Sequence, residues 1–156
     1  MKFKPLVFGG FVAFSLLFGL AAAYASSSNV LAQVTVISAC IISLDTGSIS
    51  FGSMAPGATS TDAEVNVNNT GNTQASVNVN GSAWSDGTHT MAVGQTRYSA
   101  SPGTAYGSMT ALTGTPAAAT APIAGGATTT TYWKLSIPAA QAAGAYNQTI
   151  TFSVSC

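Results

Sequence analysis

Apolar and polar residues alternate with a period of two along most of the chain, which is the pattern of half-buried β-strands. The last segment shows it most clearly, because Ile150, Phe152, Val154 and Cys156 share one face while the residues between them are Ser and Thr. We predict that this apolar face is buried. The same pattern predicts strands at 63–68, 75–80 and 132–137, a short strand at 49–51, and weaker candidates at 91–93, 96–99 and 109–113.

Turn residues separate these segments and indicate the fold class. The sequence TGNT at 70–73 lies between two of the predicted strands and predicts a hairpin. Prolines and a glycine pair divide the rest, and at most one helical turn is expected, in the alanine-rich stretch 139–145. We therefore predict an all-β domain over residues 39–156: an antiparallel β-sandwich, Ig-like or jelly-roll-like, of eight or nine short strands.

Residues 1–25 have the features of a secretory signal peptide. Two lysines precede an apolar run from Leu6 to Ala25, which ends in small residues. An uncleaved anchor is an alternative because the run is just long enough to span a bilayer, and Gly9-Gly10 admits processing of the type IV pilin kind. We expect cleavage before Ser26, secretion to the extracellular space or cell surface, and no membrane contact afterwards.

Charge is scarce and excludes several functions. Only 5% of the residues are charged, four basic and four acidic, against about 25% in an ordinary soluble protein. Without a basic stripe to neutralise phosphates, we expect no nucleic-acid partner. Few side chains are available for catalysis, because the chain has one histidine, two cysteines, four carboxylates and no cofactor motif. We predict that the chain is not an enzyme and takes no cofactor.

The few side chains that could act in catalysis or metal binding are better explained by structural roles. His89 lies in a turn-like stretch without a second histidine or a nucleophile motif. Asp62 and Glu64 lack the oxygen-rich loop of a calcium site, so we predict no metal site. Trp84 and Trp133 are expected in the core, because large aromatic side chains dominate sandwich cores.

Cysteines and asparagines suggest two covalent features. Cys40 and Cys156 are the only thiols, and in an oxidising compartment they predict one intrachain disulfide that closes nearly the whole domain. Three N-x-Ser/Thr sequons, at Asn68, Asn80 and Asn147, predict N-glycosylation sites with outward-facing glycans.

The segment 26–38 is the most informative part of the pattern. One face of its predicted strand carries Val30, Ala32, Val34 and Val36. It is either the first strand of its own domain or a donor strand that completes the sheet of a neighbouring copy. Both alternatives bury one face, so the pattern does not separate them. Head-to-tail donation does not close and therefore produces a filament.

Two stretches carry a family resemblance. The segment NVNNTGNTQASVNVNGSAW, followed by YWKLSIPAAQAAGAYNQTITFSV, resembles secreted Ig-like sandwiches, in particular archaeal thread and bundling-pilus subunits and TasA-like biofilm fibre subunits. The stretch CIISLDTGSISFGSMAPG is similar to the opening of chaperone–usher pilin and spore-coat-U domains. The C-terminal second cysteine and the missing penultimate aromatic residue depart from that second pattern. Both resemblances imply assembly by strand donation.

Together these observations predict a secreted structural subunit of an extracellular filament, such as a pilus, thread or biofilm matrix fibre. Its expected partner is another copy of the same chain, in a head-to-tail homopolymer built by donor-strand complementation. The alternative is a monomeric cell-surface or envelope β-sandwich that acts as a binding or adhesion module, with its N-terminal strand in its own domain.

Overall fold

The computed structural model describes residues 31–156. The predicted signal peptide and Val30 lie outside the described residues. A compact unit spans Val36–Cys156. Within the described part of the chain, no helix is long and apolar enough to cross a membrane.

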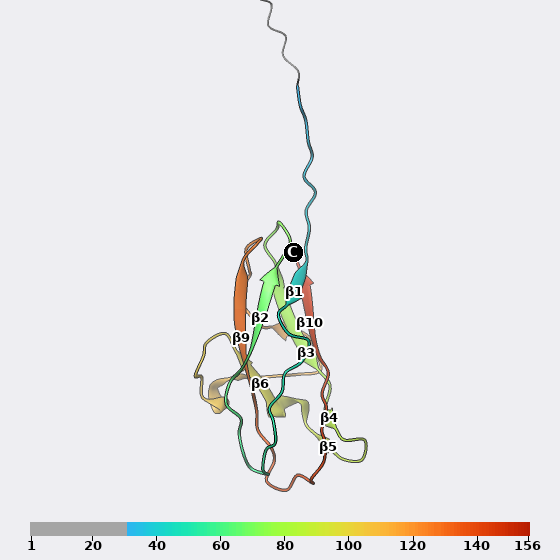
Figure 1. The fold of residues 1–156 in the computed structure, drawn as a ribbon, viewed down its shortest axis with the longest axis vertical. Helices are drawn as coiled ribbons and strands as arrows, with labels where there is room; N and C mark the ends of the chain where they lie inside the picture. Colours follow the sequence, from blue (N-terminus) through green and yellow to red (C-terminus); the bar gives the residue numbers. More distant parts are fainter. Residues whose placement is uncertain (1–30) are drawn as a thin grey trace, which may run out of the picture. The chain divides into compact units, whose positions relative to one another are not determined.

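Two antiparallel sheets pack face to face and form a β-sandwich (Figure 1). The larger sheet has the order β1-β2-β9-β6-β7, the smaller has the order β10-β3-β8, and β4 and β5 form a separate ribbon. The strands are β1 (Ile42–Leu44), β2 (Ala63–Asn69), β3 (Ser76–Gly81), β4 (Trp84–Ser85), β5 (Thr90–Met91), β6 (Thr96–Ser99), β7 (Thr110–Ala111), β8 (Ala117–Ala118), β9 (Thr128–Leu135) and β10 (Ile150–Ser155). Two short 3₁₀ helices, η1 (Val93–Gln95) and η2 (Tyr106–Ser108), complete the described elements. The predicted all-β sandwich is confirmed.

The core lies between the sheets and is built from the apolar faces of the alternating strands. Val65 and Val67 of β2 face Val77 and Val79 of β3, and all four are buried. Trp133 of β9 lies at the centre with its side chain fully buried. Its ring stands 5.3 Å from that of Tyr98 and 5.7 Å from that of Phe152, between ring centroids. A second cluster contains Trp84, Met91 and Leu135, so both tryptophans are core residues as predicted.

The predicted hairpin at 70–73 is wrong. β2 pairs with β1 and β9 in the larger sheet, whereas β3 pairs with β10 and β8 in the smaller one. The connection therefore passes from one sheet to the other, and we call residues Thr70–Thr73 the arch. The alternating pattern identifies which face of each strand is apolar, and two such faces can be buried by facing one another across a core. It does not identify which strands pair.

Two further predictions about strands need correction. Residues 49–51 form no strand, although Ile49 and Phe51 pack against the core. Residues 31–37 form no strand within their own chain, and the first described strand is β1, so the alternative in which this segment is the first strand of its own domain is not observed. A strand is stable only when its backbone pairs with a partner, and residues 31–37 take part in none of the strand ladders among the described residues.

The apolar face of β10 is only half-buried, contrary to the prediction. Ile150, Phe152 and Val154 retain partial exposure, and Cys156 is exposed. The reason is topological, because β10 is an edge strand that pairs with β3 alone. The half-exposed apolar face of this edge strand borders the candidate site.

Candidate functional site

β10 is an edge strand without the usual protection of an edge. Natural sheets protect their edges with charged side chains, proline, bulges or a covering segment, because an unpaired edge is a template for another strand. β10 has the sequence ITFSVS, which contains no charge and no proline. Its register with β3 runs without interruption from Ile150 opposite Gly81 to Ser155 opposite Ser76. The outer side of β10 is therefore open to an added strand.

A cavity of about 140 Å³ lies along this edge. Its lining is mixed: apolar side chains come from Leu44, Ile49, Phe51, Val65, Trp84, Ile150 and Phe152, and Thr46, Gly47, Ser48 and Gln148 complete it. Leu44 belongs to the larger sheet and is still 37% exposed. An engineered cavity of about 150 Å³ holds a benzene-sized group, so the volume of this groove is of the size of one or two small apolar side chains. We call the cavity and the free edge of β10 the β10 groove.

The predicted donor segment carries exposed apolar side chains. Val34 is 88% exposed and Val36 is 76% exposed. Leu31 and Ile37, on the other face of the predicted strand, are each 80% exposed, and Ala32 is exposed as well. Large apolar side chains that share a contiguous exposed stretch indicate a docking surface. In the single chain these residues remain uncovered.

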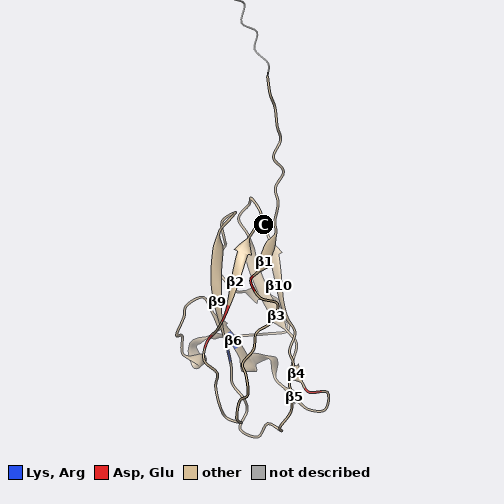
Figure 2. Ribbon diagram, in the orientation of Figure 1, with Lys and Arg blue, Asp and Glu red and all other residues tan. Residues whose placement is uncertain are grey.

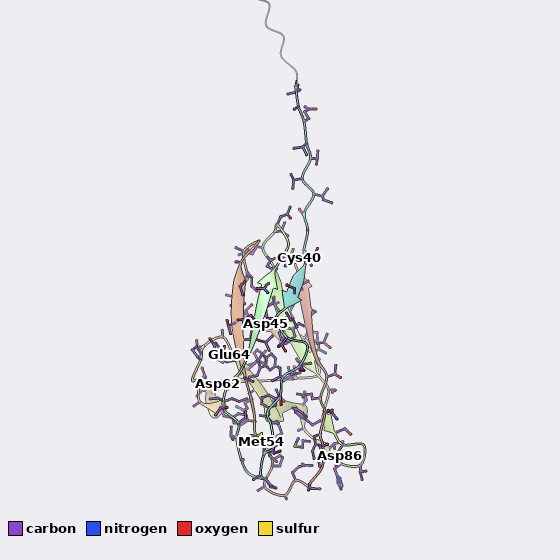
Figure 3. All side chains as sticks on the ribbon, viewed as in Figure 1. Cys40, Asp45, Met54, Asp62, Glu64 and Asp86 are labelled. Atoms are coloured by element: carbon purple, nitrogen blue, oxygen red, sulfur yellow. A yellow bond between two sulfur atoms is a disulfide. The ribbon has the colours of Figure 1, made fainter. Side chains whose placement is uncertain are left out.

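The disulfide connects the two components of this arrangement. Cys40 and Cys156 are bonded, with their Cα atoms 6.0 Å apart, and the pairing agrees with the prediction. Cys40 lies between the donor segment and β1, and Cys156 directly follows β10. Figure 3 shows Cys40 at the end of the sandwich where β1 begins and β10 ends. The base of the donor segment is thus fixed at one end of the β10 groove.

The ionisable side chains do not gather in the β10 groove. Figure 2 shows how few there are over the described strands. Lys134 Nζ lies 3.3 Å from Asp62 Oδ1 and donates a hydrogen bond to the carbonyl oxygen of Thr104. Arg97 donates to the carbonyls of Tyr106 and Gly107 in the loop before β7. These charges hold the loop 100–109 on the outer side of the larger sheet, where their role is structural.

His89 and Asp86 form a local contact in the turn between β4 and β5. The Nδ1 atom of His89 lies 3.1 Å from Asp86 Oδ2. The carboxylate also accepts the backbone N–H groups of His89 and Thr88. These backbone hydrogen bonds, chiefly that from His89, lower the pKa of Asp86 from 3.8 to about 2. The pair closes its own turn.

This contact predicts a specific dependence of stability on pH. A carboxylate whose pKa is lower in the folded state stabilises the fold above its unfolded pKa, and that contribution is lost as the pH falls through the folded value. For Asp86 the loss is expected between about pH 4 and pH 2, as the pKa shift requires. The Asp86→Asn variant should show a flatter decline of melting temperature over that interval than the wild-type chain. Thermal unfolding at several pH values tests it, and parallel declines would contradict the assignment.

The remaining predicted residues occupy different surroundings. Asn68 is partly exposed in β2 and accepts a hydrogen bond from Thr128. Asn80 is partly exposed in β3, and Asn147 is exposed just before β10. Glycosylation of these three stays a prediction. Among residues 31–156, no group of three or more His, Cys, Asp or Glu side chains could hold a metal ion.

Sequence reasoning missed the residues that hold the base of the donor segment. Asn69 ends β2 on its inward face and is 1% exposed. Gly71 and Asn72 of the arch contact the backbone at Ile37 and Ala39. The available signal was a polar residue at an inward position of the period-two pattern, immediately before TGNT.

Comparisons with protein-family models, with curated proteins and with solved structures find no match to this chain.

Proposed function

We propose that this chain is a secreted structural subunit of an extracellular filament, of the pilus, thread or biofilm-fibre kind, and that it polymerises by donor-strand complementation. One observation carries the proposal: the chain combines an exposed apolar segment with an unprotected strand edge that borders a partly apolar cavity. Each feature alone is unfavourable in water. In a chain of copies, the segment of one subunit covers the groove of the next.

The dimensions of the two surfaces support the match. The eight residues 30–37 extend about 26 Å at a rise of about 3.3 Å per residue, and the six residues of β10 extend about 20 Å. Main-chain hydrogen bonds along β10 would supply affinity, while alternate side chains entering the cavity would set the register. Val34 and Val36, with Val30 and Ala32, are the side chains assigned to the groove.

The scarcity of charge also favours packing of copies. Only six charged residues follow Ser26, namely Asp45, Asp62, Glu64, Asp86, Arg97 and Lys134. Long-range repulsion between such subunits is small. A disulfide of long sequence separation is compatible with an oxidising compartment such as the extracellular space. These properties support a secreted subunit that touches copies of itself over a large part of its surface.

Electron microscopy of the chain that begins at Ser26 tests the proposal. Negative staining should show fibres one domain wide, and deletion of residues 26–38 should abolish them while the β-sheet signal in circular dichroism persists. The compact unit that starts at Val36 contains every strand of the sandwich, so the deletion removes no strand of the domain. Dispersed particles from the undeleted chain would contradict filament formation and favour a monomeric surface module.

A pair of charge substitutions in the donor segment gives a sharper prediction. Val34→Asp should abolish fibres, because docking would bury an unpaired carboxylate against Ile150 and Phe152 in the groove, at a cost of several kcal/mol. Thr35→Asp adds the same charge at the adjacent position on the opposite face and should retain fibres. Both residues are exposed in the single chain, so neither change should alter its melting temperature. Sedimentation of polymer measures the outcome, and equal yields from the two variants would exclude the assigned face.

A further inference from the structure

The arch holds the base of the donor segment through several hydrogen bonds to its backbone. The N–H of Ala39 donates to Asn72 Oδ1 at 2.7 Å, and Asn72 Nδ2 donates to the carbonyl of Ile37 at 2.9 Å. The carbonyl of Ala39 accepts from the N–H of Asn72 at 3.1 Å and from the hydroxyl of Thr73 at 3.0 Å. Asn72 therefore bonds to the segment through its side chain twice and through its backbone once.

These contacts hold residues 37–41 in an extended conformation. The carbonyls of Ile37 and Ala39 bond to Asn72, and the carbonyl of Ile41 accepts from the N–H of Thr70. Bonds to every second residue on one side of a chain are the pattern of a strand ladder. Directly after them Ile42 pairs with Asn69 at the start of β1. The arch thus prolongs the line of β1 back toward the donor segment.

The arch itself is fixed from inside the domain. Buried Asn69 donates through Nδ2 to the carbonyls of Thr73 (2.7 Å) and Ile123 (2.9 Å). Its Oδ1 accepts from the N–H of Gly71 at 3.0 Å. An unpaired buried amide is costly, so these bonds keep the arch in one conformation.

Two glycines permit the close packing on either side of the arch. A Cβ atom at Gly71 would stand 2.1 Å from the carbonyl oxygen of Ala39. A Cβ atom at Gly125 would stand 2.8 Å from the carbonyl carbon of Asn72. Both separations are shorter than atoms tolerate, so the backbone can approach this closely only without side chains at these positions.

The position of the arch decides where the donor segment can go. β10 runs toward Cys156, whose bond to Cys40 places the base of the segment at that end of the β10 groove. To enter the groove of its own domain, the chain would have to reverse direction between residues 37 and 41. Such a reversal would break the hydrogen bonds that the backbone of residues 37–41 makes to Asn72 and Thr70.

We infer that the arch, with Asn72 as its positioning residue, prevents the donor segment from filling its own groove and so makes strand donation intermolecular. The inference rests on the proposed function. It adds the structural feature that directs the donor segment to the groove of a second copy and away from the groove of its own domain. Loss of Asn72 would free residues 37–41 to turn. The segment could then complete its own domain, and a closed monomer would compete with the filament.

The experiment compares the chain from Ser26 with its Asn72→Ala variant and with Gln74→Ala as the matched control. Gln74 is an exposed amide residue beside the arch, and no hydrogen bond of its side chain to another described residue occurs. Each chain is unfolded, refolded at micromolar concentration and separated into polymer and monomer. Limited proteolysis of each monomer fraction then reports whether residues 26–38 are protected, and circular dichroism reports the melting temperature.

The inference expects a monomer fraction at least threefold larger in Asn72→Ala than in the wild-type chain, with residues 26–38 protected in that monomer. Gln74→Ala should behave as wild type. Polymer yield and proteolysis unchanged in Asn72→Ala, with fibres still formed by the wild-type chain, would overturn the inference alone. A wild-type monomer with protected residues 26–38 would overturn both the inference and the proposed function. Asn72→Ala could also lose polymer while residues 26–38 of its monomer are still cleaved and its melting temperature is lowered. That result would show that Asn72 only stabilises the fold, and it would overturn the inference.

Discussion

Removal of the Cys40–Cys156 disulfide is expected to lower the free energy of unfolding by about 4–5 kcal/mol. The bond spans 116 residues of sequence, and cross-linking so long a loop restricts the unfolded chain strongly. Domains of this size have total stabilities of only about 5–15 kcal/mol. The change therefore brings the domain close to its unfolding threshold. The bond also joins the regions before β1 and after β10, so its loss frees both sides of the groove at one end.

Urea denaturation of the Cys40→Ser/Cys156→Ser double variant measures this effect. The wild-type chain in reducing buffer should match the variant, and the variant should be insensitive to reductant. A chain lacking residues 26–38 allows the comparison to be made on a monomer, because polymerisation would add its own stabilisation. A loss below about 1 kcal/mol would show that the loop-entropy account does not apply to this domain.

Replacement of Trp133 by alanine is expected to lower the free energy of unfolding by about 3–5 kcal/mol. Its side chain is fully buried and packs against the rings of Tyr98 and Phe152. Its indole N–H also donates to Thr131 at 2.8 Å. Truncation leaves a cavity between the two sheets and an unpaired hydroxyl acceptor. Because Phe152 belongs to β10, the damage reaches the strand that borders the groove.

Trp133→Phe is the matched control for this substitution. It keeps a ring between the sheets but loses the hydrogen bond to Thr131, so we expect a smaller loss, nearer to that of one buried hydrogen bond at about 1 kcal/mol plus a reduced cavity cost. Urea denaturation followed by circular dichroism gives both values. Equal losses in the two variants would mean that the hydrogen bond, and not the packing of the ring, supplies the stability.

The period-two pattern predicted much of this fold for a simple reason. In a half-buried strand, alternation reports directly which side chains face the core. It located β2, β3 and β10 and the second half of β9, whose first half, 128–131, it missed. It could not show that β2 and β3 belong to different sheets. Two strands show the same alternation of apolar and polar side chains whether they pair within one sheet or face one another across the core. Pairing is decided by contacts such as Ala63 with Trp133, which are distant in sequence.

The candidate site was only partly predictable. The apolar donor segment and both cysteines are visible in the sequence. The groove is not, because the alternation of β10 predicts a buried apolar face, and the partial exposure of that face follows from the position of β10 at the edge of the smaller sheet. Asn69 and Asn72 look like ordinary turn residues. Their roles depend on the carbonyls of Ile123, Ile37 and Ala39, which local sequence cannot locate.

The order of strands in the two sheets has a consequence for the timing of folding. β10 pairs with β3 about 70 positions earlier in the chain, and β9 pairs with β2 at a similar separation. Such long-range pairing slows folding, since distant segments must meet before any contact is gained. During synthesis or export from the N-terminus, the donor segment emerges first and β10 emerges after every other strand. In the proposed filament, a newly made copy would therefore be able to offer its segment well before it could receive one.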